Sequence, residues 1–149
     1  MKIDKIKKRE NPEAKFHTKL VKWINNNIEL FPKPFKFETK VVRKDSKNFT
    51  FKELSAKEER LLLNVKNSHY VQTHSDLDRT GTHCDGDCLF NMDSYIIIRW
   101  EKSEKYNRKY DKLFYVIDID DFLKAREVFK KPLTEEVALI IAFLVGELK

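Results

Sequence analysis

The chain has 149 residues, of which 36% are charged and 12% aromatic, and it carries a formal net charge of +6. This length favours one domain with a single core, and the aromatic content argues against intrinsic disorder. The sequence has neither a secretory leader nor an apolar run of transmembrane length, so we expect a cytoplasmic protein that does not enter a membrane. The positive charge favours an acidic or nucleic-acid partner.

The N-terminal part of the chain predicts an arm, a helix and a strand in turn. Residues 1–10 are basic and contain few apolar residues, so we expect a flexible arm there. Asn11-Pro12-Glu13 combines a capping side chain, a proline at the first helical position and a first-turn acid, which predicts a helix start. Apolar residues then recur at helical spacing to about Ile28. Residues 35–42 alternate apolar and polar side chains, as a half-buried strand does.

The remaining elements alternate between helices and strands. Ser55 and Glu58 match a capping box at the start of a second helix. Thr134 caps a predicted terminal helix whose apolar face extends to Leu144 and Val145. Between these helices we expect strands at 70–73, 88–90, 95–100 and 113–119, a turn at 91–93, an exposed loop at 101–112 and a short helix at 121–129. The order predicts an α/β fold, a single domain over residues 11–149 with a mixed central β-sheet flanked by helices.

The strand over residues 35–42 places a carboxylate beside an amine. Residues two apart on a strand point the same way, so Lys36, Glu38, Lys40 and Val42 share one face. We expect Glu38 and Lys40 both to face solvent or a cleft. Phosphodiester hydrolysis needs such a pair, one group to hold a divalent metal and one to offset an anion, plus at least one more carboxylate. Charged residues also alternate on the solvent face of many ordinary strands, and that interpretation stays open.

A polar loop before the strand at 88–90 supplies candidates for the missing carboxylate. It contains four acids, namely Asp76, Asp78, Asp85 and Asp87. One interpretation is a solvated acidic loop. Another is that Asp87 joins Glu38 around a Mg²⁺ or Mn²⁺ ion, because it abuts the strand and a strand end holds a ligand in place. Asp85, two residues earlier, would then be a solvated or supporting acid, and Asp76 similar.

The same loop also contains the residue types that bind zinc. His74, His83, Cys84 and Cys88 offer imidazole and thiolate ligands, which suit that metal. However, Cys-x₃-Cys is not a usual zinc spacing, and the adjacency of His83 and Cys84 strains a four-ligand site. Zinc binding therefore stays open as an alternative. The two cysteines of a chain without an export signal favour a reducing compartment over a disulfide.

Several short motifs occur in a characteristic order from about Asn11 to the C-terminus. They are Phe37-Glu38-Thr39-Lys40, Phe51-Lys52-Glu53-Leu54, Ser75-Asp76, Gly81, Asp87-Cys88-Leu89-Phe90, Tyr95-Ile96-Ile97-Ile98, Ile117-Asp118-Ile119-Asp120-Asp121-Phe122 and Leu133-Thr134-Glu135-Glu136. Their colinear order resembles the RecU-like Holliday-junction resolvases of phages and bacteria, within the PD-(D/E)XK nuclease superfamily. The family's His-Gln pair falls near Lys57 and Glu58. In most of the superfamily the metal-binding aspartate precedes Glu-x-Lys, whereas Asp87 follows it here.

The resemblance implies a restriction-endonuclease-like fold and a Mg²⁺-dependent (or Mn²⁺-dependent) endonuclease acting on branched DNA in a bacterial or phage-infected cell. Glu38, Lys40 and Asp87 would be the catalytic residues, with Glu38 and Asp87 holding the metal. Further acids that could contribute are Asp76, Asp85, Glu13 and Glu58, although capping and helix-start roles already account for Glu58 and Glu13.

The partners implied by the resemblance are a DNA junction and a second copy of the chain. A junction needs two symmetric cuts, which a homodimer would make. The basic residues that we expect to follow the phosphate backbone are Lys36, Arg43, Lys44, Lys47 and Lys52. The alternative is a non-catalytic or zinc-stabilised DNA-binding module on the same scaffold.

Overall fold

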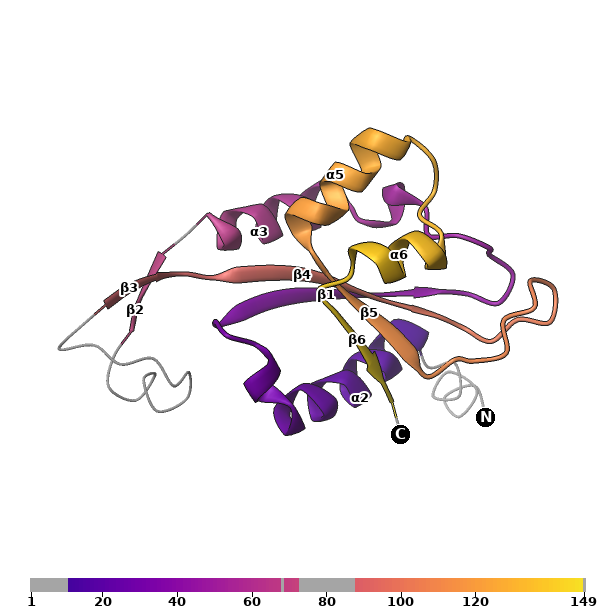
Figure 1. Cartoon of the computed structure of the whole chain (residues 1–149), viewed down its shortest axis with the longest axis horizontal. Coiled ribbons are helices and arrows are strands. Elements are labelled where there is room, and N and C mark those ends of the chain that lie inside the picture. The colour runs from indigo at the N-terminus through magenta and orange to yellow at the C-terminus, as the bar shows by residue number, and fades with distance from the viewer. Residues whose placement is uncertain (1–10, 68, 73–87, 149) are drawn as a thin grey trace, which may run out of the picture.

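The computed structural model describes residues 11–67, 69–72 and 88–148 (Figure 1). The elements in chain order are α2 (Pro12–Asn26), η1 (Ile28–Leu30), β1 (Phe35–Val42), η2 (Phe51–Glu53), α3 (Ala56–Lys66), β2 (His69–Gln72), β3 (Cys88–Asn91), β4 (Asp93–Trp100), β5 (Leu113–Asp118), α5 (Ile119–Phe129), α6 (Glu135–Ile141) and β6 (Leu144–Glu147). The predicted arm over 1–10 and the polar loop before β3 lie outside the described residues. No helix within the described ranges is long and apolar enough to cross a membrane.

The centre of the fold is a four-stranded sheet with the order β1-β4-β5-β6. β1 runs parallel to β4, and β4-β5 and β5-β6 are antiparallel pairs. A separate pair, β2 and β3, extends beyond one end of this sheet (Figure 1). The predicted single α/β domain with a mixed central sheet is therefore confirmed.

Helices cover both faces of the sheet and divide the core into two layers. α3, α5 and α6 lie on one face and α2 on the other (Figure 1). The strands alternate between these layers, because successive side chains point to opposite faces. On β4, Ile96 and Ile98 pack in the α3 layer, whereas Tyr95 and Ile97 pack in the α2 layer.

Side-chain caps fix where the helices begin. The Asn11 side chain accepts a hydrogen bond from the Glu13 amide at 2.9 Å, and Pro12 is the first residue of α2, as predicted. Ser55 and Glu58 form the predicted capping box of α3, which satisfies two amides that a helix start leaves without partners. Thr134 caps α6 through the Val137 amide.

The predicted terminal helix is wrong beyond Ile141. Leu144 and Val145 belong to strand β6, which pairs with β5. The apolar spacing continues past the helix end, so the sequence pattern did not mark the change. Gly146 makes this pairing possible, since a Cβ at that position would lie 2.1 Å from the Phe114 ring. A side chain at this position would require the buried Phe114 ring to move.

The predicted turn at 91–93 is also wrong. Met92 is the single residue between β3 and β4, and the two strands continue in nearly the same direction (Figure 1). One residue is too short for a reversing turn, which needs at least two. β4 consequently leaves β2 and β3 and pairs with β1 and β5 instead.

Candidate functional site

The charged face of β1 meets the first turn of α3. The Lys40 ammonium donates hydrogen bonds to both carboxylate oxygens of Glu58, at 3.1 and 3.0 Å. The capping box places Glu58 at the third helical position, so its side chain lies at the helix start that faces β1. Glu38 is on the same face of β1 as Lys40, two residues away. Glu38, Lys40 and Glu58 thus form the candidate site.

The expectation that Glu38 and Lys40 both face solvent or a cleft is wrong for Lys40. Its residue is only 8% exposed, whereas Glu38 is half-buried. Lys40 lies on the face of β1 toward α3, and its ammonium is paired with the Glu58 carboxylate. Burial of the ammonium follows from α3 crossing β1, which is a tertiary contact that alternation along the strand does not reveal.

Burial and one neighbouring like charge perturb Glu38. Desolvation by burial and the neighbouring Glu58 carboxylate raise the pKa of Glu38, and the Lys36 and Lys40 charges only partly oppose this shift. Two carboxylates near each other disfavour the ionised state of one of them. A cation bound between them would relieve that repulsion.

Glu58 responds in the opposite direction. Burial alone would raise its pKa, but the Ser55 amide and the Lys40 ammonium hydrogen-bond to the charged form and lower the pKa below its ordinary value. Glu58 therefore stays ionised while it caps α3 and pairs with Lys40. Of the two carboxylates, Glu38 is the one that titrates closer to neutral pH.

The other predicted metal-site residues are not brought to this site by the described part of the chain. Asp76, Asp85 and Asp87 lie outside the described residues. Glu13 lies on α2, which packs on the opposite face of the sheet from Glu58. Within the described ranges, no group of three or more His, Cys, Asp or Glu side chains is close enough to hold a metal ion.

The described residues do not test the zinc interpretation. His74, His83 and Cys84 lie outside the described residues, and Cys88 is the first residue of β3.

The predicted DNA-binding residues lie along β1 and the connection that follows it. Lys36 is on the same strand face as Glu38, and its charge acts on the Glu38 carboxylate. Arg43, Lys44 and Lys47 are exposed in the segment just after β1, and Lys52 is exposed in η2. The strand thus leads directly from the candidate site to three of the five cations.

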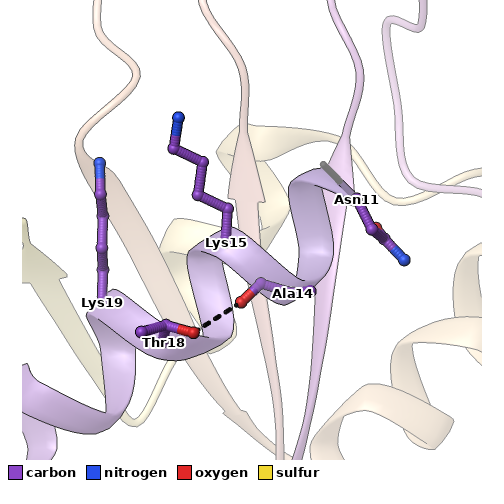
Figure 2. A pocket seen from close by; sticks show the side chains of 5 residues that line it. All are labelled: Asn11, Ala14, Lys15, Thr18 and Lys19. Atoms are coloured by element: carbon purple, nitrogen blue, oxygen red, sulfur yellow. Dashed lines mark hydrogen bonds between the residues drawn. The ribbon is translucent and has the colours of Figure 1, made fainter. Parts of the chain in front are cut away.

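A separate hollow of about 430 Å³ lies on α2. Figure 2 shows its lining, with the Lys15 and Lys19 side chains extending away from the helix and the Thr18 hydroxyl donating to the Ala14 carbonyl at 3.1 Å. This hydrogen bond lies within the helix. None of its lining residues in the described part of the chain is a carboxylate, and the hollow belongs to the helix on the other face of the sheet, so it is not part of the candidate site.

Sequence reasoning missed the residues that shape the segment after β1. Arg108 and Glu101 hold it through hydrogen bonds across more than fifty residues of chain. No local motif signals these contacts. For Glu58, the sequence offered a signal in the resemblance, because the family's His-Gln pair overlaps Lys57 and Glu58.

A scan against models of protein families, a search of curated proteins and a search of solved structures each found no match.

Proposed function

We propose that this protein is a metal-dependent DNA endonuclease that cleaves branched DNA, similar to a Holliday-junction resolvase on a restriction-endonuclease-like scaffold, and that it acts as a homodimer. The observation that carries the proposal is the pair of carboxylates, Glu38 and Glu58, beside the Lys40 ammonium. Phosphodiester hydrolysis uses this combination of an anionic metal site and a cation for the phosphate.

The described residues fit a Mg²⁺ or Mn²⁺ ion in the kind of ligand they offer. Both metals prefer carboxylate oxygens. Burial and the neighbouring Glu58 carboxylate raise the pKa of Glu38, and a bound cation would favour its ionised form again. Mg²⁺ is commonly held by one or two carboxylates, with water and substrate phosphate completing its shell. Asp87, the third carboxylate expected from the sequence, would complete the set of metal ligands that the protein provides.

Each residue of the candidate site would have one role. A bound divalent ion supplies a water of lowered pKa and neutralises charge on the phosphate. Glu38 contributes an ionised carboxylate, which requires it to lose its proton. Lys40 stabilises the charge that develops on the phosphate oxygens. The Lys40 ammonium is hydrogen-bonded to the Glu58 carboxylate. If the Glu58 side chain turned toward a bound metal, the ammonium would become available to the substrate.

The alternative is a non-catalytic DNA-binding module. The complete pairing of Glu58 favours it, since that carboxylate already caps α3 and neutralises Lys40. In that case the three residues would form a structural ion-pair cluster. Cleavage measurements separate the two functions, because only an endonuclease converts bound DNA to product.

The central experiment compares a four-way junction with a linear duplex of the same sequence. Each is incubated with the protein in Mg²⁺, in Ca²⁺ and in a chelator. We expect paired nicks in the junction with Mg²⁺, little cleavage of the duplex, and binding without cleavage in Ca²⁺. Tight junction binding with no product under any metal would establish the non-catalytic module instead. Equal cleavage of both substrates would remove the preference for branched DNA.

A paired substitution tests the third ligand. Asp87→Asn should lose Mg²⁺-dependent nicking and still bind the junction, whereas Asp85→Asn should keep most of its activity. The reverse pattern would move the metal ligand by two residues. Full activity in both variants would remove Asp85 and Asp87 from the metal site and return this segment to the interpretation of a solvated acidic loop. Elemental analysis of the purified protein separates this site from a zinc site in the same segment.

A further inference from the structure

Two loops meet at the end of the sheet where β1 and β4 finish. One is the segment 43–47 after β1, and the other is the 101–112 connection between β4 and β5. They lie side by side at the end opposite β2 and β3 (Figure 1). Glu101 joins them, since its carboxylate accepts hydrogen bonds from the Arg43 side chain and the Lys44 amide, both at 3.1 Å.

The main chain of the first loop is held by hydrogen bonds from side chains of the second loop and of the adjoining end of β4. The carbonyl oxygens of residues 43–46 accept hydrogen bonds from side chains of the second loop, and the Lys47 carbonyl accepts one from Trp100 at the end of β4 as well as a longer one from Arg108. The bonds are Arg108 Nη2 to Arg43 at 3.0 Å, Ser103 Oγ to Lys44 at 2.6 Å, Tyr106 Oη to Asp45 at 3.4 Å, Arg108 Nη1 to Ser46 at 2.7 Å and Trp100 Nε1 to Lys47 at 3.2 Å. The partly negative carbonyls therefore face the second loop and are already paired.

Arg108 is the centre of this arrangement. Besides the first loop, its Nε donates to the Glu101 carbonyl at 2.8 Å, and its guanidinium lies over the Tyr106 ring at 5.7 Å. A guanidinium has five N–H donors in a fixed fork, which suits binding several carbonyls at once. These contacts occupy Arg108 within the protein, so it acts as a positioning residue for the first loop.

The side chains around this fastened main chain are mostly basic and exposed. We name this surface the basic ledge and define it by the exposed cations of the two loops, Arg43, Lys44, Lys47, Lys102, Lys105, Lys109 and Lys112. The exposed acids in the same loops are Asp45 and Glu104. The ledge ends toward α6, where a hollow that contains Lys47 and Arg108 is bordered by Glu135 and Glu136.

We infer that the basic ledge binds the phosphate backbone of a duplex DNA arm beside the cleavage position. This inference rests on the proposed function and extends it to Lys102, Lys105, Lys109 and Lys112. A fixed array of exposed cations complements a regular polyanion, and little further ordering is needed on binding. Of the large apolar side chains exposed in the described residues, Tyr110 is the one within the ledge, whereas a membrane-surface element would present several.

The strand sets the distance between the ledge and the candidate site. Five residues of extended chain separate Glu38 from Arg43, or roughly 17 Å at about 3.3 Å per residue. Phosphates along one DNA strand are spaced by about 3.4 Å, so the ledge would contact backbone roughly five base pairs from the cut. An arm shorter than this would not reach the ledge.

The test measures DNA binding in Ca²⁺, so that it does not depend on cleavage. The variant is Lys102→Gln/Lys105→Gln/Lys109→Gln, and the control Lys22→Gln/Lys124→Gln/Lys131→Gln removes the same charge from exposed positions on or beside α2 and α5. If each ledge lysine contacts one phosphate, the slope of log K against log salt becomes shallower by about 2.7. Near 0.1 M salt we expect at least about tenfold weaker binding to a long-armed junction, with the control close to wild type.

A second measurement checks the position of the ledge. With junction arms trimmed to about three base pairs, the ledge variant and the wild type should bind equally. Equal weakening by the ledge variant and the control would show a net-charge effect and overturn the inference. The inference would also be overturned if the ledge variant bound DNA as wild type does but no longer bound anionic lipid vesicles. If the ledge variant loses DNA binding and the wild type cleaves no DNA in Mg²⁺, the inference that the ledge binds DNA would hold and the proposed nuclease function would be wrong.

Discussion

β1 connects two charged regions that are built in opposite ways. In the candidate site, charged side chains are partly withdrawn from water and interact with one another, which perturbs the pKa of Glu38. In the basic ledge the cations stay in water, and the hydrogen bonds hold the main chain beneath them. Burial suits groups that must change their protonation or their partner. Exposure on a fixed main chain suits groups that only attract an anion.

The largest expected effect is on cleavage by Glu38→Gln. An amide keeps the shape of the side chain but is a much poorer metal ligand than a carboxylate, so the nicking rate should fall at least about a hundredfold. Junction affinity in Ca²⁺ should change far less, because the ledge is intact. Single-turnover nicking and equilibrium binding measure the two quantities.

Glu29→Gln is the matched control for that change, since Glu29 is exposed on η1. It should retain the wild-type rate. A wild-type rate in Glu38→Gln would remove Glu38 from the site and with it the proposed chemistry of β1.

The next effect distinguishes neighbouring acids on α3. Glu58→Gln should reduce the nicking rate by about tenfold or more, because it removes a carboxylate from the site and the partner of Lys40. Glutamine at this position can still accept the Ser55 amide bond, so the helix start should persist. Glu59→Gln is the control, because the Glu59 carboxylate pairs with Arg126 at 2.7 Å instead.

Equal rates for the two variants would assign Glu58 to structure alone. Lys40→Ala is a poorer probe than either, because it would leave Glu58 without its partner at a half-buried position. We expect that change to cost about 1–3 kcal/mol of unfolding free energy, which would confuse loss of activity with loss of fold.

A smaller effect is expected from Arg108→Lys in the basic ledge. Lysine keeps the charge but cannot bind the Glu101, Ser46 and Arg43 carbonyls together. DNA affinity should fall severalfold, because the loop must then be ordered on binding, while the salt slope stays the same. Amide hydrogen exchange over residues 43–47 should become faster.

Arg60→Lys, at an exposed position of α3, is the control for the arginine-to-lysine change. If Arg108→Lys lowers the salt slope as well, then Arg108 itself contacts a phosphate, and its role as a positioning residue is wrong.

The smallest effect concerns pH. The raised pKa of Glu38 means that the folded protein binds a proton there more tightly than the unfolded chain does. Its contribution to stability is therefore lost as pH rises from the ordinary glutamate pKa through the raised one. Glu38→Gln should gain stability relative to wild type across this window, by no more than about 0.5 kcal/mol. Thermal unfolding of both proteins at several pH values measures the difference.

The cleavage rate at subsaturating Mg²⁺ gives the same information from activity, because it reports the site before the metal binds. Its acid limb should lie above the ordinary glutamate pKa in wild type and shift lower in Glu58→Gln, because the Glu58 charge helps to raise the pKa of Glu38. A limb that stays in place in Glu58→Gln would show that desolvation alone causes the shift.

Local rules predicted much of this fold. Asn11, Ser55 and Thr134 marked helix starts correctly, because capping depends on residues within a few positions of each other. Alternation along residues 35–42 correctly placed Glu38 and Lys40 on one strand face. The end of α6 was missed, since Leu144 and Val145 fit a helical face as well as a strand, and their pairing with β5 is a contact that local spacing does not reveal.

The candidate site was predictable only in part, because local geometry determines some of its contacts and tertiary packing determines the others. Glu38 and Lys40 share a strand, so their proximity follows from local geometry. The burial of Lys40 depends on how α3 crosses the sheet. The fastening of residues 43–47 by Arg108 depends on two loops about sixty residues apart, and neither contact has a local signature.

The position of α3 has a consequence for how a metal would be taken up. The helix is attached to three strands, by Glu58 to Lys40 on β1, by the Leu62 carbonyl to the buried Ser94 hydroxyl on β4 at 2.6 Å, and by Lys66 to Asp118 at the end of β5. Sliding the helix would break all three attachments at once. Ion uptake by Glu38 and Glu58 would therefore proceed by rotation of the two side chains over a stationary backbone. Backbone amide chemical shifts of residues 60–66 should then stay nearly constant during a Mg²⁺ titration, while side-chain signals of the two glutamates move.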